Sequence, residues 1–311
     1  MHRVAAPLAA VLIGLALTGC GGDGAEPGAP EGATLVLDFQ PNAVHAGIYA
    51  AQANGFFEDE GVDLTIREPS STADAGKLLE TGRADFGVMD INDFGIARER
   101  DLDLVAIAAI VQRPLASVIA RDRDEIQAPA DLAGKTVGVT GVPSDDAVLD
   151  TVLRAGGVAP GDVRRVTIGF NAVAQLAAGR IDAATAFWNA EGVQLKELGI
   201  PTREFRVDEF GAPRYPELVL VARDQRRDEE IRSALLSGYE LLADRPETAL
   251  DDLIAEVPGL EPSAQLSQLR ALTSAEAFAS GARTATPELS EESVQRWRSW
   301  AESAGLLAGS S

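Results

Sequence analysis

The stretches LASVIARD (115–122) and LVLVARD (218–224) decide the fold that the sequence predicts. Both are apolar, and both end on the triplet Ala-Arg-Asp. Short apolar runs rich in β-branched residues are typical of buried strands. Each run stands beside a series of alternating strand and helix patterns, so we interpret the two runs as segments that cross between two lobes. The alternative is that both are ordinary strands of one large domain.

The patterns around these two runs predict an α/β fold whose sheets are rich in parallel strands. Before the first run, strands are predicted at 34–38, 62–67, 84–89 and 104–111, with helices at 44–54, 73–81 and 91–100. Between the runs, strands are predicted at 136–140, 163–168 and 181–187, with helices at 145–154, 172–178 and 190–198. Residues 228–307 have helical patterns throughout. We therefore expect lobe 1 to comprise 34–120 and 220–311 and lobe 2 to comprise 121–219, with a cleft and a hinge between them.

Composition excludes several classes of function. The 311 residues suffice for two domains. The net charge of −21 repels nucleic acid. One cysteine and two histidines are too few to form an internal disulfide, a cysteine-rich zinc site or an iron–sulfur cluster. The motifs G-x-S-x-G and H-E-x-x-H do not occur in the sequence. We expect no enzyme, no cofactor, no metal site and no nucleic-acid partner.

The first 33 residues indicate secretion and anchoring. Arg3 precedes an apolar run, 4–17, which is typical of a signal peptide and is shorter than the roughly 20 residues that span a bilayer. The motif LTGC (17–20) resembles the lipobox of bacterial lipoproteins, which implies cleavage after residue 19 and a lipid on Cys20; a buried free thiol is the alternative. Residues 20–33, rich in Gly, Pro and acidic residues, predict a flexible tether. We expect an extracytoplasmic protein whose membrane contact is the lipid anchor alone.

Several motifs in the rest of the chain resemble one family. They are LDFQPN (37–42), HAGIY (45–49), GFF (55–57), EGVD (60–63), GRADFG (82–87), DLAGK (131–135), GRIDA (179–183) and YPELV (215–219). This set resembles the extracytoplasmic substrate-binding proteins of ABC importers, type II, and within them the group for thiamine pyrimidine precursors with its neighbours for sulfonates, nitrate and riboflavin. The resemblance implies a type II periplasmic-binding-protein fold whose lobes are joined by two crossing strands. It also implies a monomer that binds a small molecule and delivers it to an ABC permease with its ATPase.

Candidate ligand-binding residues follow the predicted strands, because ligands of open α/β sheets bind at the carboxyl ends of the strands. In the first part of the chain they are Asp38, Phe39, Gln40, Asn42, His45, Tyr49, Met89, Asp90 and Asn92. In the second part they are Ser144, Asp145, Phe187, Trp188, Glu191 and Tyr215. For several of them a structural role is the alternative, since Asp and Asn are preferred helix caps and a tryptophan is often core.

An aromatic residue and a carboxylate at one strand end suit a flat, amine-bearing heterocycle. The ring of the ligand would stack on Trp188, and its N–H edge would donate to Glu191. The resemblance implies the same acidic residue, because Glu191 opens an intact E-G-V run; it also implies a tryptophan where Phe39 stands. Asp145 and Asp146 at a helix start disfavour anions such as nitrate, sulfonate or phosphate.

The sequence therefore predicts the substrate-binding component of an ABC importer, and the best prediction for its ligand is a thiamine pyrimidine precursor such as formylaminopyrimidine or hydroxymethylpyrimidine. Binding of riboflavin, an alkyl sulfonate or nitrate on the same fold is the alternative. A pyrimidine-synthase-like enzyme is disfavoured because its cysteine-rich motif has no counterpart here. A sensing domain of a signalling receptor is disfavoured because no output domain follows in this sequence.

Overall fold

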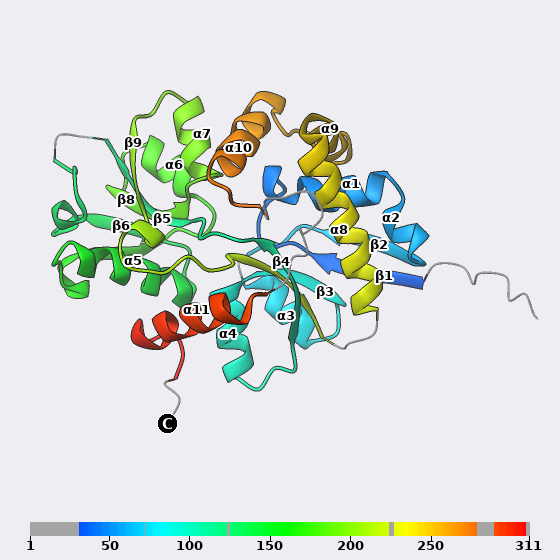
Figure 1. Cartoon of the computed structure of the whole chain (residues 1–311). Helices are drawn as coiled ribbons and strands as arrows, with labels where there is room; N and C mark the ends of the chain where they lie inside the picture. Colours follow the sequence, from blue (N-terminus) through cyan, green and yellow to red (C-terminus); the bar gives the residue numbers. More distant parts are fainter. Residues whose placement is uncertain (1–30, 72, 123–124, 224–226, 279–288, 309–311) are drawn as a thin grey trace, which may run out of the picture.

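The computed structural model describes residues 31–71, 73–122, 125–223, 227–278 and 289–308 (Figure 1). The predicted signal peptide, Cys20 and most of the predicted tether lie outside the described residues. The last three residues of that tether, 31–33, instead belong to the first strand. Among the described helices, none combines the length and the apolar character that a membrane span requires.

The first lobe is built on a five-stranded sheet of order β2-β1-β3-β10-β4. Its strands are β1 (Glu31–Val36), β2 (Val62–Arg67), β3 (Phe86–Asp90), β4 (Val105–Val111) and β10 (Leu218–Ala222). β1 pairs in parallel with β2 and β3, whereas β10 is antiparallel to both of its neighbours. Successive residues of β10 enter different cores: Leu220 packs with α1, α8 and α9, and Val219 and Val221 pack with α3, α4 and α11. This alternation follows from the period of two of a strand.

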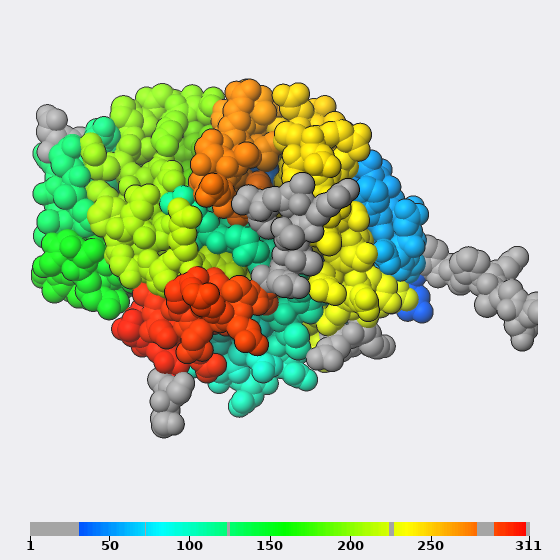
Figure 2. All heavy atoms as spheres, in the orientation of Figure 1, coloured from blue at the N-terminus to red at the C-terminus, as the bar shows by residue number. Residues whose placement is uncertain are grey.

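The helices that pack with the first sheet come from both ends of the described chain. They are η1 (Ala43–His45), α1 (Ala46–Ala53), α2 (Phe56–Asp59), α3 (Asp74–Glu80), α4 (Ile91–Glu99), α8 (Asp228–Asp244), α9 (Pro246–Glu256), α10 (Pro262–Ser274) and α11 (Glu291–Ser303). In Figure 2, α10 (orange) lies between the second lobe and α9 (yellow). The Ser267 hydroxyl on α10 donates to the Glu197 carboxylate of the second lobe at 2.7 Å. The C-terminal helices thus bridge the two lobes at this face.

The second lobe is built on a separate five-stranded sheet of order β7-β6-β8-β5-β9. Its strands are β5 (Ala116–Arg121), β6 (Thr136–Val139), β7 (Arg164–Thr167), β8 (Ala183–Phe187) and β9 (Thr202–Arg206). Its helices are η2 (Pro129–Leu132), α5 (Pro143–Ala155), η3 (Pro160–Asp162), α6 (Ala172–Ala177), α7 (Glu191–Glu197) and η4 (Val207–Glu209). The two sheets show that the described chain is not folded around one large sheet. β9 was not predicted, because its alternating sequence TREFR buries one apolar side chain, Phe205.

The two apolar runs are central strands and not the crossing segments themselves. β5 pairs with β8 and β9, and β10 pairs with β3 and β4. The chain changes sheet just before each of them, at 112–115 and at 207–217, which we call the first and second crossing segments. Residues 116–120 therefore lie in the second sheet, although we predicted them for lobe 1. A run that is apolar on both faces indicates a strand buried on both faces, which is a central strand.

Helices α1 and α8 approach so closely that two glycines are required at their contact. A Cβ atom on Gly238 would lie 2.0 Å from the Gly47 carbonyl oxygen and 2.7 Å from the Ala51 Cβ. We predict that Gly238→Ala lowers the free energy of unfolding by about 1–3 kcal/mol, because backbone must move to admit the methyl group. Urea unfolding measures the change. Gly161→Ala, where a Cβ meets nothing within 4 Å, serves as the control and should be nearly neutral.

Candidate functional site

One cavity lies between the two lobes and draws its walls from both sheets. The lining includes five carboxyl side chains, two phenylalanines, four small hydroxyl side chains and several aliphatic ones. They are Asp38, Asp90, Asp93, Asp145, Glu191, Phe39, Phe187, Ser117, Thr140, Ser144, Thr185, Ala75, Val88, Met89, Ala116, Val142, Val148 and Ala186. Among these described lining residues there is no lysine, arginine or histidine.

The cavity forms where the carboxyl ends of strands from both sheets meet. Asp38 and Phe39 follow β1, and Met89 and Asp90 end β3. From the second lobe, Ser144 and Asp145 lie in the first turn of α5 after β6, Phe187 ends β8, and Glu191 begins α7. The structure thus brings together eight of the predicted ligand-binding residues at this cavity: Asp38, Phe39, Met89, Asp90, Ser144, Asp145, Phe187 and Glu191. The strand-end rule for open α/β sheets accounts for the agreement.

Most of the cavity carboxylates are held by hydrogen bonds to one of their oxygens. Asp145 Oδ2 accepts from the Thr140 amide at 2.5 Å and from the Thr185 hydroxyl at 2.9 Å. Glu191 Oε2 accepts from the Phe187 amide at 3.1 Å. Asp90 Oδ1 accepts from the amide of Asn92 at 2.6 Å and thereby caps α4. These bonds fix the orientation of the carboxyl groups.

Burial dominates the protonation of these acids. Desolvation raises the pKa of Glu191 to about 7. Desolvation, supported by the charge of Asp90, raises the pKa of Asp93 to about 8. Burial also raises the pKa of Asp145, although its bonds to Thr140 and Thr185 act in the opposite direction. Negative charge is costly in the cavity, so a ligand that donates hydrogen bonds or carries positive charge would relieve that cost.

Asp93 was not among the predicted residues. It lies one turn into α4, directly after the predicted Asp90 and Asn92, in the sequence DIND (90–93). Ser144 of the second lobe faces it closely enough to act against the rise in its pKa. Asp93 could have been predicted from its spacing of three residues from Asp90, because this spacing places both acids on one side of the first helical turn.

Aromatic side chains from both lobes meet beside the cavity. The Phe39 ring lies edge-to-face with Phe170 of the second lobe, with 4.7 Å between ring centroids and 81° between planes. It also lies 6.4 Å from the Phe187 ring. Phe170, in the turn after β7, was not predicted. The pair of Phe39 and Phe170 brings the two lobes into direct contact beside the cavity.

The other predicted residues of the segment 40–49 are not among the lining residues of the cavity. Gln40 is exposed, and Tyr49 is buried in the core of the first lobe. Asn42 caps η1 by accepting from the Val44 amide at 3.0 Å. His45 is fully buried: its Nδ1 accepts from the Asn42 amide at 3.2 Å, so the proton lies on Nε2, which donates to Asp38 Oδ1 at 2.9 Å. His45 therefore orients Asp38, and His45 itself is not among the lining residues of the cavity.

Trp188, Asn92 and Tyr215 also lie outside the cavity lining. Trp188 is 1% exposed and donates its indole N–H to the Pro114 carbonyl at 3.0 Å. The prediction that Trp188 stacks on a ligand is therefore corrected: Phe187, the last residue of β8, lines the cavity, whereas Trp188, in the turn that follows, packs in the core of the first lobe. Tyr215 stacks on Trp300 at 5.3 Å, and Asn92 accepts from the Trp297 indole at 2.7 Å.

In the part of the chain that the structure describes, no group of three or more His, Cys, Asp or Glu side chains is arranged to hold a metal ion. The cavity lining offers carboxyl acceptors together with two phenylalanine rings. Such a site can take up a flat ring with several N–H donors.

Comparisons with known proteins identify relatives over most of the chain. A family model described as NMT1/THI5 like matches residues 42–249. The formylaminopyrimidine-binding protein of Halalkalibacterium halodurans is 34% identical over 231 residues, which cover 72% of this chain and 70% of that protein. The 4-amino-5-hydroxymethyl-2-methylpyrimidine phosphate synthase of Legionella pneumophila is 28% identical over 177 residues, which cover 57% of this chain and 56% of that protein.

A solved structure confirms the predicted fold class. The alkanesulfonate-binding protein of Xanthomonas axonopodis pv. citri, bound to MOPS, aligns with a TM-score of 0.69 at 17% sequence identity. The alignment covers 90% of this chain and 96% of that chain. At this identity the likeness concerns the fold alone, which is the two-lobed α/β fold of periplasmic binding proteins.

Proposed function

The chain belongs to the NMT1/THI5-like family, and from that premise we propose that it is the substrate-binding component of an ABC importer. Its ligand is a small nitrogen heterocycle with exocyclic amines, best a thiamine pyrimidine precursor such as formylaminopyrimidine or hydroxymethylpyrimidine. The lobes close on this ligand and deliver it to a permease. The name of the relative from Halalkalibacterium halodurans supports this ligand class.

The observation that carries the proposal is the charge pattern of the cavity. Five carboxyl groups line it, and the described lining holds no cationic side chain. An aminopyrimidine edge offers N–H donors to Glu191 and to the other cavity acids, and its bond to a carboxyl group that is ionised would be charge-assisted. The Phe39 and Phe187 rings supply an aromatic wall on which a flat ring stacks. Phe39 thereby takes the stacking role that the sequence assigned to Trp188.

The same charge pattern argues against the anionic alternatives. A sulfonate or nitrate would enter a cavity of five acids without an arginine or lysine to pair with, and burying an unpaired charge is unfavourable. A synthase role is supported only by relatives of lower identity. A role in binding without catalysis is also consistent with a cavity that has no cysteine among its described lining residues. The lipid anchor at Cys20 and the extracytoplasmic location remain part of the proposal.

Titration calorimetry with matched ligands tests the proposed function. We expect 4-amino-2-methylpyrimidine derivatives to bind with a Kd of about 1 μM or below. The analogue without the exocyclic amine should bind roughly tenfold more weakly or worse, because it leaves a buried carboxylate without its donor. Alkyl sulfonates, nitrate and riboflavin serve as comparison ligands. Binding of alkyl sulfonates alone would refute the heterocycle proposal.

A further inference from the structure

Phe39 and Phe170 are half-buried phenylalanines that belong to none of the hydrophobic cores of the described residues. Phe39 follows β1 of the first lobe, and Phe170 lies in the turn between β7 and α6 of the second lobe. Their rings meet edge-to-face, with 4.7 Å between centroids. Phe187, by contrast, packs against two of these cores. Each of the two rings thus has its aromatic partner in the other lobe.

The backbone on both sides of Phe39 is held within the first lobe. Asp38, which precedes it, accepts from His45 Nε2 at 2.9 Å. Gln40, which follows it, accepts at its carbonyl from the Asn42 side-chain amide at 2.9 Å. Because both neighbours of Phe39 are fixed by these bonds, its ring is presented to the second lobe from a defined place.

The turn that carries Phe170 is closed by bonds of its own. The backbone amide and the side-chain amide of Asn171 both donate to the Ile168 carbonyl, at 3.3 and 2.9 Å. Gly169 and Phe170 are the two central residues of this turn, and Gly169 has a φ of +54°, a conformation that favours glycine. None of these bonds involves the ring of Phe170, so the turn leaves that ring to the contact with Phe39.

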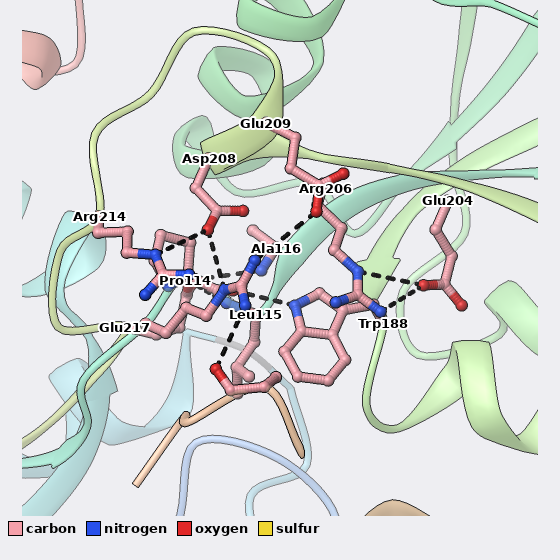
Figure 3. A network of polar contacts seen from close by, with 12 residues as sticks. Pro114, Leu115, Ala116, Trp188, Glu204, Arg206, Asp208, Glu209, Arg214 and Glu217 are labelled. Carbon is pink, nitrogen blue, oxygen red and sulfur yellow. Dashed lines mark hydrogen bonds and ion pairs between the residues drawn. The ribbon is translucent and has the colours of Figure 1, made fainter. Parts of the chain in front are cut away.

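The lobes are joined through the two crossing segments, and bonds between these segments hold the joint together (Figure 3). Arg113 of the first segment donates to Asp208 of the second at 2.9 Å. Glu217 Oε2, at the end of the second segment, accepts from the Leu115 amide at 2.6 Å. Any motion between the lobes therefore turns about this joint and changes the contacts that the lobes make elsewhere, among them the contact between the two rings.

We infer that Phe39 and Phe170 form an aromatic latch between the lobes, and that Phe170 is a positioning residue which acts on the ligand through Phe39. The inference rests on the proposed function in taking the cavity as the ligand site. Phe39 lines the cavity and Phe170 does not, so Phe170 holds the cavity wall from behind. When the lobes part, both rings lose their partner and face water, which is unfavourable. Since protein atoms alone make the pair, it favours closure with or without a ligand.

A polar contact between the lobes is a weaker candidate for this role. The Ser267 hydroxyl on α10 donates to the Glu197 carboxylate at 2.7 Å, and this bond is exposed to solvent. Water can replace an exposed hydrogen bond when the lobes part, so the bond contributes little to closure. Water offers no such replacement for an aromatic contact. The ring pair is therefore the contact that favours closure.

Distances between two spin labels test the latch in the full chain without ligand. The labels are carried by cysteines in place of Glu68, after β2, and Ala177, at the end of α6; both positions are exposed, and Cys20→Ser leaves no other cysteine. We expect a closed and an open distance. Their ratio should fall roughly three- to tenfold in Phe170→Leu, as for the loss of one aromatic pair. An open distance alone in the labelled parent, or an unchanged distribution in Phe170→Leu, would overturn the inference.

The rate of ligand dissociation tests the coupling to the cavity. Stopped-flow measurements use hydroxymethylpyrimidine as the ligand. We expect Phe170→Leu to raise the dissociation rate constant roughly three- to tenfold without lowering the association rate constant, because the ligand enters open lobes, in which the rings are apart. A dissociation rate equal to that of the wild type would contradict the inference. A wild type that binds no aminopyrimidine would instead refute the proposed function, and the spin-label result would still decide the latch.

Two further variants separate the latch from simple packing. In a Phe39→Leu background, Phe170→Leu should change the dissociation rate constant little, because Phe170 acts through Phe39. Effects of the two substitutions that simply multiply would contradict the inference. Phe210→Leu is the matched control, since Phe210 meets Phe205 edge-to-face at 5.6 Å within the second lobe. It should lower the thermal stability and leave the ratio of closed to open molecules and the dissociation rate unchanged.

Discussion

Glu191→Gln is expected to weaken the binding of an aminopyrimidine by a factor of roughly 30 or more, which corresponds to about 2 kcal/mol or more. Glu191 is anchored through Oε2 to the Phe187 amide at 3.1 Å, and it lies in a cavity without a cation among the described lining residues. Glutamine preserves the anchor and the size of the side chain. It removes the charge that strengthens the bond to an N–H edge, and it offers a donor where the ligand also donates.

Titration calorimetry of the variant and of a matched control measures this effect. Glu80→Gln changes the same residue type at an exposed position at the end of α3 and should leave the Kd within about twofold of the wild type. Circular dichroism and thermal unfolding of both variants establish that the fold is intact. If Glu191→Gln binds aminopyrimidines as tightly as the wild type, Glu191 is not the ligand carboxylate.

Asp93→Asn is expected to raise the free energy of unfolding at about pH 8.5 by about 1–3 kcal/mol, and to have a clearly smaller effect at about pH 5. Desolvation raises the pKa of Asp93 to about 8 in the folded protein, whereas the unfolded chain keeps the ordinary low value. The protonated folded form is thus favoured. Its contribution to stability is fully present at low pH and is lost as the pH rises through about 8. Asparagine is neutral at every pH and avoids this loss.

Urea unfolding at the two pH values gives the required comparison. Each pKa unit corresponds to about 1.4 kcal/mol, and water in the cavity screens part of the shift, which sets the expected range. Asp103→Asn removes an acid whose side chain is 97% exposed and should leave the pH dependence unchanged. A decrease in stability at the higher pH in Asp93→Asn would show that the Asp93 carboxylate is stabilised in the folded state, contrary to the prediction.

The elements of the fold were predictable wherever burial imposes a period on the sequence. All nine predicted strands, counting the two apolar runs, match observed strands, because apolar runs bounded by Gly, Pro or charged residues mark buried strands. The exception, β9, is an edge strand of the second sheet with one buried apolar side chain, so it has no such pattern. The crossing segments were misplaced for a related reason: sequence patterns mark the buried strands, and the segments between sheets have no period of their own.

The sequence by itself determined the fold class and eight residues of the cavity, because parallel strands always present their carboxyl ends at one edge. Only the tertiary structure decided which neighbouring side chains face that edge. Phe187 enters the cavity and Trp188 leaves it, His45 acts through Asp38, and Asp93 joins the acids from the next helical turn. The direction in which a side chain points and the depth of its burial depend on contacts between segments that lie far apart in the chain, and no local pattern encodes them.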